Sequence, residues 1–395
     1  MKILASRNFS NLVLISVLAF IAISPLYFYG ALSVQITTNL NYRPSLHGFG
    51  TTAFYLVAAI FAISLGRKAD YADPVFTLKT SMLITCLISI GISISNSLQE
   101  ICVFLAIGGI GNALATPGIA KFVNDQIDKN SHGLAYGFKQ SATGLSTLVG
   151  AAAIPFVATG GQWRIVFLIG ALISLAIFLS LQRRSVELDF ISNWRIYFSR
   201  NFEVSSARKR YTLEVKLIAI SFGLGAAVGA GLITYLPLSN AELGLNPAQS
   251  SFTIGLASFS SLITRFLVLQ YMDRTKIDAI KICIGMMALG ALGLIGISTM
   301  KTSYITISAL ISYAFGWGWI GLITYKMLRI SEDNIGANVG LVQSAAAVGS
   351  IIGPITLASI YEFSGFQLMW QISSIALFAS LLLLVYSQLA GKAGR

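Results

Sequence analysis

The chain has 395 residues, of which 55% are hydrophobic and only 11% are charged, and its formal net charge is +12. Soluble domains carry about 25% charged residues. This composition, with a mean hydropathy of +0.76, therefore excludes a water-soluble globular protein. The length leaves room for many segments of the roughly 20 apolar residues that cross a bilayer. The sequence is that of a membrane-embedded protein.

Twelve apolar stretches, in two sets of six, predict an all-α membrane protein. Lipid offers no partners to backbone N–H and C=O groups, so each stretch must form a helix. We expect the first span to be retained, because it is too long for a cleaved signal peptide. The predicted spans are 12–36, 46–66, 75–95, 101–120, 134–158, 163–182, 214–238, 250–272, 279–299, 304–328, 337–358 and 366–388.

The distribution of positive charge predicts the orientation. If the N-terminus lies inside, the outer connections hold only Arg43, Arg164 and Lys301, and nearly all other Lys and Arg residues lie at inner ends and loops. Such a bias is typical of cytoplasmic loops. We therefore expect a multi-pass protein of the inner membrane with both termini in the cytoplasm. The charge is not expected to bind nucleic acid, and the partner of the chain is the lipid bilayer.

Two pairs of landmarks indicate an internal repeat. The same number of residues separates Asp70 from Asp273 as separates Gln140 from Gln343, and this offset is about half of the chain. Two similar halves around a central site are typical of transporters. The predicted domains are an N-terminal six-helix bundle at 1–182, a cytoplasmic linker at 183–212 and a C-terminal six-helix bundle at 213–395.

The linker is the only long polar stretch. It is rich in arginine and also carries Phe190, Trp194 and Tyr197. One interpretation is a solvated connector in the cytoplasm. The other is an amphipathic helix lying on the membrane surface.

The connection between the second and third spans carries the residues of a family motif. Gly66 and Asp70 are four residues apart and enclose Arg67 and Lys68, and the second-half counterpart keeps Asp273-Arg274 but lacks the glycine. Twelve spans divided six plus six, with this charged inner loop, resemble the major facilitator superfamily (MFS). The resemblance implies two pseudo-symmetric six-helix bundles and transport by alternating access.

A longer resemblance runs through residues 109–167. It includes Gly111-Asn112-Ala113 in the fourth span, Lys139-Gln140 in the fifth and Trp163-Arg164 at the sixth. These residues are similar to bacterial facilitators of the cyanate- and nitroimidazole-permease type. They specify transport but do not identify a solute.

Two basic residues are predicted inside spans, where a charge is costly and its presence suggests a role. Arg265 stands eight positions before Asp273, about 12 Å above the inner end of its helix, and Lys139 lies about 8 Å deep. In the facilitator fold the fifth and eighth spans pack together, so the resemblance places both cations beside the cavity. No acidic residue is predicted deep in a span, and an anionic solute would relieve the repulsion between the cations.

The resemblance sharpens the expectation for Arg265. An arginine at this distance from the loop aspartate occurs in oxalate/formate-, monocarboxylate- and nitrate-type facilitators, where it binds the anion. A guanidinium suits this task because it grips a carboxylate with two parallel hydrogen bonds. Alternatively, Arg265 bonds to neighbouring helix ends, and Lys139 extends to the inner surface.

Uncharged residues complete the predicted substrate site, although each can instead serve packing between helices. Gating is assigned to the loop motifs, in which carboxylates would bond to neighbouring helix ends and cations when the inner side is closed. The further substrate candidates are Asn112, Tyr27, Tyr29, Tyr235, Tyr313, Trp317, Gln140 and Gln343, and the gating candidates are Gly66, Asp70, Asp273 and Arg274.

The sequence therefore predicts a secondary transporter for a small solute, and not an enzyme. The preferred solute is a small organic anion, carried by a uniporter or exchanger, because no carboxylate within a span offers a proton carrier. The alternative is a permease or efflux transporter for a neutral, cationic or amphipathic solute. We expect a monomer with no cofactor and no metal site.

Overall fold

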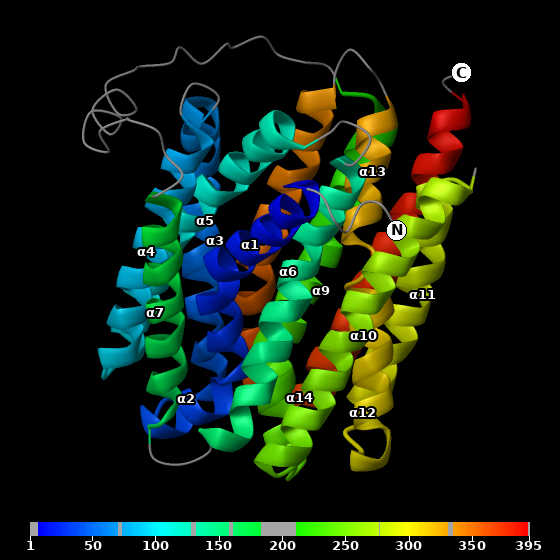
Figure 1. Ribbon diagram of the computed structural model, residues 1–395. Helices are drawn as coiled ribbons and strands as arrows, with labels where there is room; N and C mark the ends of the chain where they lie inside the picture. Colours follow the sequence, from blue (N-terminus) through cyan, green and yellow to red (C-terminus); the bar gives the residue numbers. More distant parts are fainter. Residues whose placement is uncertain are drawn as a thin grey trace.

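The long helices of the computed structural model run along one axis (Figure 1). Both chain termini lie toward one end, here called the termini end, and the short helix α2 marks the opposite α2 end. The predicted linker 183–212 lies outside the described residues except for Tyr211 and Thr212. The structure describes residues 7–69, 73–127, 132–157, 161–182, 211–275, 277–330 and 335–393.

The first six spans, here called the N-half, are continuous helices joined by short connections. At the α2 end, α2 (Ser33–Asn39) and the 3-10 turn η2 (Pro44–His47) join the first two spans, and η4 (Ile154–Phe156) follows the fifth. The spans are α1 (Arg7–Ala31), α3 (Gly48–Ala69), α4 (Pro74–Ile94), α5 (Leu98–Gln126), α6 (His132–Ala153) and α7 (Trp163–Gln182).

The last six spans, here called the C-half, include two interruptions. The tenth span is divided between α12, the π-helical turn η5 and α13, and the last two spans form the single element α14. The elements are α9 (Leu213–Glu242), α10 (Pro247–Arg274), α11 (Ala279–Ser298), α12 (Thr302–Ile311), η5 (Ser312–Gly316), α13 (Ile320–Ile330) and α14 (Ile335–Ala393).

The prediction of twelve membrane helices in the facilitator arrangement is confirmed. By length and composition, ten segments of the described chain qualify as membrane spans. Segment Asn338–Ala390 counts once, although α14 is broken at Gly365 into two arms. The second reason why ten segments are found and not twelve is α6, which carries Lys139 and Gln140 and is not among the ten.

Side-chain caps fix where several helices begin. Asp73 accepts a hydrogen bond from the backbone N–H of Val75 (3.1 Å) at the start of α4. Asn246 and Gln249 form a reciprocal capping box at the start of α10. Such caps satisfy backbone donors that have no partner within the helix. They define the first residues of these helices.

The predicted helix over 304–328 is interrupted, contrary to expectation. After the π-turn η5, Trp317 leaves helical geometry (φ −125°, ψ −15°) before α13 begins. Gly318 and Gly316 flank it, and Gly316 packs directly against Gly290 of α11. The apolar sequence conceals the break, because hydropathy reports burial in lipid and not backbone geometry.

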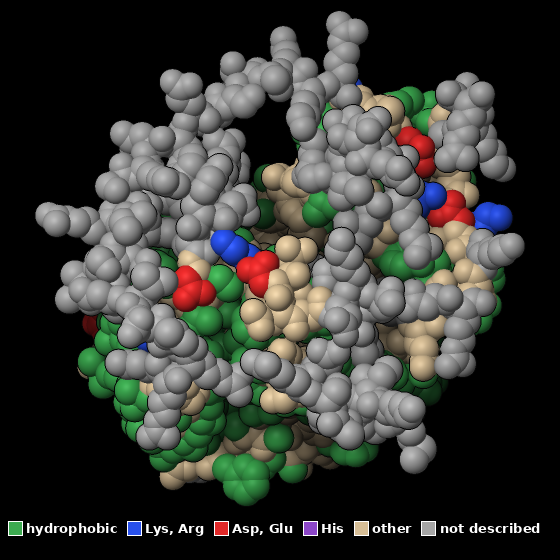
Figure 2. All heavy atoms as spheres, turned by 45° about the horizontal axis from the view of Figure 1, so that its top comes forward, with side chains coloured by type: hydrophobic (Ala, Val, Ile, Leu, Met, Phe, Trp, Pro, Cys, Tyr) green, Lys and Arg blue, Asp and Glu red, His purple; other side chains and the backbone are tan. Residues whose placement is uncertain are grey.

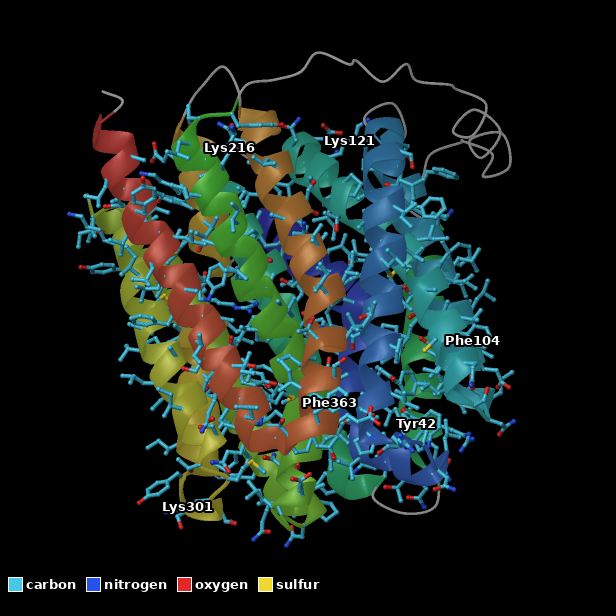
Figure 3. The ribbon with its side chains drawn as sticks, turned by 180° about the vertical axis from the view of Figure 1, so that it is seen from behind. Tyr42, Phe104, Lys121, Lys216, Lys301 and Phe363 are labelled. Atoms are coloured by element: carbon cyan, nitrogen blue, oxygen red, sulfur yellow. The ribbon has the colours of Figure 1, made fainter. Side chains whose placement is uncertain are left out.

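The sharp reversal within α14 depends on one glycine. Gly365 has φ +74° and ψ −179°, a conformation that side-chain-bearing residues rarely adopt. Figure 3 shows the two arms of α14 meeting near Phe363 at the α2 end and separating toward the termini end. The exposed faces of the bundle are apolar, as in α7, where Leu172 is 66% exposed. Such faces suit contact with lipid.

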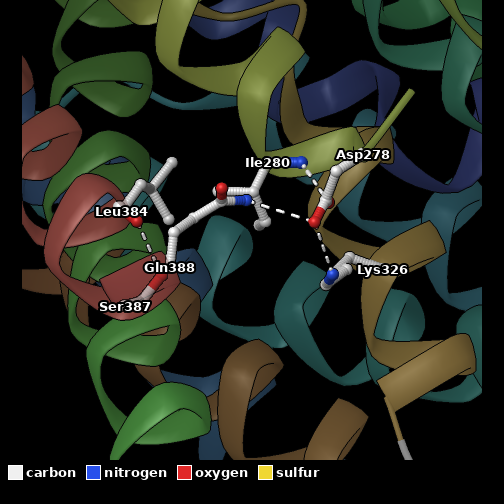
Figure 4. Close-up of polar contacts among 6 residues, drawn as sticks. All are labelled: Asp278, Ile280, Lys326, Leu384, Ser387 and Gln388. Carbon is white, nitrogen blue, oxygen red and sulfur yellow. Dashed lines mark hydrogen bonds and ion pairs between the residues drawn. The ribbon is translucent and has the colours of Figure 1, made fainter. Parts of the chain in front are cut away.

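Asp278 ties three elements together near the termini end (Figure 4). Its carboxylate caps α11 by accepting from Ile280 N (3.0 Å), and it also accepts from Lys326 Nζ on α13 (2.9 Å) and Gln388 Nε2 on α14 (3.2 Å). Burial raises the pKa of this carboxyl, but the three donors outweigh burial, so its pKa lies below the ordinary value.

In Figure 2, with this end turned forward, acidic and basic side chains lie among apolar ones.

We predict that Asp278→Asn lowers the free energy of unfolding at pH 7 by about 1 kcal/mol, because asparagine keeps the cap but loses the ion pair. A lowered pKa contributes stability that is present above the ordinary value and is lost as pH falls through the lowered one. The difference between wild type and variant should therefore shrink in acid. Thermal unfolding in detergent between pH 7 and pH 3 measures it. Asp73→Asn, at the matching cap of α4, is the control, and equal losses at pH 7 would contradict the prediction.

Candidate substrate cavity

A cavity of about 610 Å³ lies between the two halves. It is lined by α1, α3, α5 and α6 of the N-half and by α9, α10, α13 and the first arm of α14, with Trp317 from the break in the tenth span. No described residue of α4, α7 or α11 lines it. The walls are rich in alanine, and the lining residues of α3, Tyr55 to Ala62, come from the part of that helix away from the α2 end. The cavity therefore extends from the middle of the bundle toward the termini end.

Arg265 is the most firmly held polar side chain in the cavity wall. It is only 4% exposed. Its Nη1 donates to the Gln140 carbonyl (3.0 Å) and to Thr143 Oγ1, both on α6. Its Nη2 donates to the Trp317 carbonyl (3.1 Å), while the buried Nε has no partner. One guanidinium thus links the N-half to the break in the tenth span.

The break supplies the acceptor that Arg265 uses. Interruption of a helix frees carbonyls that hydrocarbon cannot satisfy. Here the Trp317 carbonyl accepts from Arg265, the Gly316 carbonyl accepts from Trp319 Nε1 (2.7 Å), and the Trp319 carbonyl accepts from Leu322 N (2.9 Å). The guanidinium carbon of Arg265 also lies 4.3 Å from the centroid of the Trp317 ring. This contact adds a cation–π interaction.

Lys139 lies on α6 in the same cavity and is only half-buried. No described residue forms an ion pair or a side-chain hydrogen bond with it. No Asp or Glu is found among the described residues that line the cavity. The cavity therefore carries two cations, and the charge of Lys139 is not neutralised by the described part of the chain.

Aromatic rings of both halves meet beside Arg265. Tyr27 of α1 stacks on Trp317 with ring centroids 5.9 Å apart, and Tyr313 packs edge-on against Trp317 at 5.6 Å. Tyr27 and Trp317 line the cavity, whereas Tyr313 is buried behind them and its hydroxyl donates to the Leu232 carbonyl (3.3 Å). Two aromatic rings, one from each half, thus form part of the cavity wall.

Three other predicted residues lie on the cavity wall. Asn112 of α5 has no hydrogen-bond partner among the described residues, and Gln343 Nε2 of α14 donates to Thr324 Oγ1 (3.4 Å). Gln140 lines the cavity next to Lys139. These side chains give an otherwise apolar wall several donors and acceptors.

Tyr29 and Tyr235 do not line the cavity but lie in the contact that closes the α2 end. Tyr29 donates to the His47 carbonyl (2.7 Å) and is packed face to face with the His47 ring. Tyr235 Oη lies 2.9 Å from the Pro354 carbonyl in the C-half and 3.3 Å from the Ser45 carbonyl in the N-half. Both tyrosines are fully buried there.

The structure adds polar cavity residues that the sequence reasoning missed. Thr143 and Thr116 each follow a predicted residue, Lys139 and Asn112, by four positions, which puts them on the same helix face. This spacing could have identified both of them. No comparable signal marks Tyr55 of α3. The residues added are Tyr55, Thr116, Thr143, Thr324 and Ser350.

The predicted gating residues are only partly described. Gly66 lies in the last turn of α3. Asp70 lies outside the described residues. The backbones of Asp273 and Arg274 end α10, but their side chains are not described. Their gating role stays a prediction.

Comparison with known proteins agrees with this architecture. The family model described as Major Facilitator Superfamily matches residues 12–354. A bacterial homologue of the human lysosomal transporter Spinster, in an inward-facing and occupied conformation, is similar over 98% of each chain with 16% identity and a TM-score of 0.68. The inward-facing, unoccupied form of a bacterial Spinster homologue is similar with 14% identity and a TM-score of 0.66, over 97% of this chain and 96% of that one. No curated protein matches the chain.

We predict that Thr143→Val lowers the free energy of unfolding by about 1–3 kcal/mol, because it leaves a charged N–H of Arg265 without an acceptor. Thermal unfolding in detergent measures the loss. Thr147→Val, one turn further along α6, is the control, because the Thr147 hydroxyl donates only to the Thr143 carbonyl of its own helix (3.1 Å). Equal losses in the two variants would show that the contact with Arg265 contributes nothing.

Proposed function

Because the chain belongs to the Major Facilitator Superfamily and is a secondary transporter, not an enzyme, we propose that its solute is a small organic anion. The observation that carries this proposal is the pair of cations, Arg265 and Lys139, in a cavity without a described acidic residue. Like charges repel strongly where water is scarce, and a bound anion relieves that repulsion. A volume of about 610 Å³ is ample for a small carboxylate.

The hydrogen bonds of Arg265 support a specific way of binding. Both donors of Nη1 are directed to α6 and one donor of Nη2 to Trp317, so Nε and one Nη2 hydrogen remain. Nε and Nη2 together can donate two parallel bonds to a carboxylate. Since Nε is buried, an anion must displace neighbouring side chains to reach it. Lys139, which is partly exposed in the cavity, would make the first contact.

A second candidate is a neutral, cationic or amphipathic solute, imported or exported. The observation that favours it is the apolar lining, in which alanines and the stacked rings of Tyr27 and Trp317 make up much of the wall. In that case Arg265 would serve as a bond between helices. Transport that is indifferent to the charge of Arg265 and Lys139 distinguishes this candidate from the first.

We propose transport by alternating access, as a uniporter or exchanger, with the α2 end as the closed outer side. Polar contacts between the halves gather there. Thr51 Oγ1 lies 3.0 Å from Thr234 Oγ1, Thr52 donates to the Ile351 carbonyl (2.9 Å), and Arg43 pairs with Glu362 (2.8 Å). The inward-facing state of the similar bacterial structures supports the same orientation.

In this proposal the protein lies in the inner membrane, and its termini end faces the cytoplasm. The N-terminal bundle at 1–182 and the C-terminal bundle at 213–395 would rock about the cavity, joined by the linker 183–212. Asp70 and Asp273 would form the inner gate when the α2 end opens. The transporter would act as a monomer.

We predict that Arg265→Gln lowers the initial rate of anion uptake into proteoliposomes at least tenfold, since a lost hydrogen bond to a charged group costs about 1.5–3 kcal/mol. Lys139→Gln should lower the rate less, and Lys139→Arg should retain most of it. A panel of radiolabelled small carboxylates, measured by uptake and counterflow, provides the assay.

Lys301→Gln is the matched control for that assay, because Lys301 is exposed beside α12, away from the cavity. Each variant must keep its thermal unfolding midpoint within a few degrees of wild type. If Arg265→Gln does not, Arg265→Lys is measured in its place. Uptake of a neutral solute with full rate in both charge variants would overturn the anion proposal and favour the second candidate.

We also predict that a disulfide between Thr51→Cys and Thr234→Cys stops transport, because it holds the α2 end closed. The hydroxyl oxygens are 3.0 Å apart, so cysteine sulfurs at these positions would lie close to each other. The background should lack Cys86, Cys102 and Cys283. Oxidation should abolish counterflow, and reduction should restore it. Unchanged counterflow in the cross-linked protein would contradict closure at this end.

A further inference from the structure

A second cavity, of about 470 Å³, opens on the outer surface of the C-half. Its floor is α9, and its two sides are the arms of α14, which separate from their junction near Phe363 (Figure 3). It is distinct from the substrate cavity, which lies on the other side of α9 and the first arm of α14. The lining includes Ile220, Leu224, Val348, Ile352, Ile372 and Ala376.

The floor of this groove is held by close helix contacts. Gly353 lies so near α9 that an added Cβ would be 2.6 Å from the Ala227 carbonyl oxygen, and Gly349 is equally confined against Gly223. On the other side Ser221 of α9 bonds to Ser380 of the second arm (2.8 Å). Small residues permit this approach. The groove thus lies between three closely packed segments.

The groove offers an occupant almost no polar group. The hydroxyls of Thr356 and Ser373 donate to carbonyls of their own helix, Ile352 (3.0 Å) and Met369 (2.8 Å). Ile220, Val348 and Ile352 are 53–56% exposed and belong to segments that are long and apolar enough to cross a bilayer. The medium around the middle of such a segment is hydrocarbon. An acyl chain is therefore the fitting occupant.

A free cation stands at one end of the groove. Lys216 lies four residues before Ile220, on the same face of α9 and about 6 Å further toward the termini end. Figure 3 shows it at the upper end of α9, at the end of the molecule where the arms of α14 are apart. It is exposed, and its ammonium group has no partner among the described residues. A basic residue at the bilayer surface attracts anionic lipid headgroups.

The dimensions agree with one lipid molecule. The lining of α9 from Ile220 to Val228 covers about 12 Å, and that of α14 from Ala345 to Ile360 covers about 22 Å. Half of a bilayer's hydrocarbon core is about 15 Å thick. A chain that starts at a headgroup on Lys216 would end within the groove.

We propose that this groove is a binding site for an anionic phospholipid, with the headgroup at Lys216 and an acyl chain between α9 and the arms of α14. The site faces the leaflet at the termini end. The existence of this site does not depend on which solute the central cavity carries. Its test is a measurement of lipid binding and not of transport.

The test is native mass spectrometry of the purified chain titrated with phosphatidylglycerol or with phosphatidylcholine of the same acyl chains. Wild type should hold one phosphatidylglycerol severalfold more tightly than phosphatidylcholine. Lys216→Gln should weaken the binding of phosphatidylglycerol about fivefold and leave the binding of phosphatidylcholine unchanged, because it removes the attraction of about 1 kcal/mol that one basic residue contributes. Val348→Trp, which fills the groove, should weaken both lipids.

Two variants serve as matched controls. Lys281→Gln removes an exposed lysine at the same end on α11, and Leu292→Trp places an indole on an exposed face of α11, 63% exposed, outside the groove. Both should bind as wild type does. If Val348→Trp binds both lipids as tightly as Leu292→Trp does, the acyl-chain site is overturned. If Lys216→Gln binds phosphatidylglycerol as tightly as Lys281→Gln does, or if wild type binds the two lipids with equal affinity, the proposed headgroup contact with Lys216 is overturned.

Discussion

The structure depends on the requirement that every backbone polar group find a partner where water is absent. The tenth span breaks after η5, and the freed carbonyl of Trp317 would be costly in hydrocarbon. Arg265 satisfies it, at 3.1 Å, from the neighbouring α10. A buried guanidinium and a broken helix are each unfavourable alone, and together they satisfy one another. The cavity is built around this pair.

The same pairing gives Arg265 a position that a solute can use. Its remaining bonds go to Gln140 and Thr143 of the opposite half, so the side chain lies between two bodies that must separate in alternating access. In the proposed function an anion would compete with these neutral acceptors for the guanidinium. Hydrogen bonds between ionised partners are about twice as strong as those to neutral groups. Binding of the anion would thus replace the hydrogen bonds that Arg265 makes between the halves.

Sequence reasoning identified the spans because the bilayer fixes their length and polarity. It did not predict which face of each helix lines the cavity, because lipid-facing and protein-facing surfaces are both apolar in this chain. Ile233 lines the cavity, while Tyr235, two residues and about 200° further around α9, lies in the closed α2 end. Lys139 and Arg265 were identified because charge within a span is conspicuous. The break at Trp317 was missed because its residues are apolar.

The wall shared by the two cavities has a consequence for regulation. Ala226 of α9 and Ala346 of α14 face the substrate cavity, while Ala227 and Ala345 line the outer groove. The α9–α14 helix pair separates the two spaces. A lipid in the groove and a solute in the cavity would therefore contact the same helix pair from opposite sides. By linkage, if the lipid favours one arrangement of α9 and α14, the solute that binds this arrangement more tightly must also strengthen lipid binding.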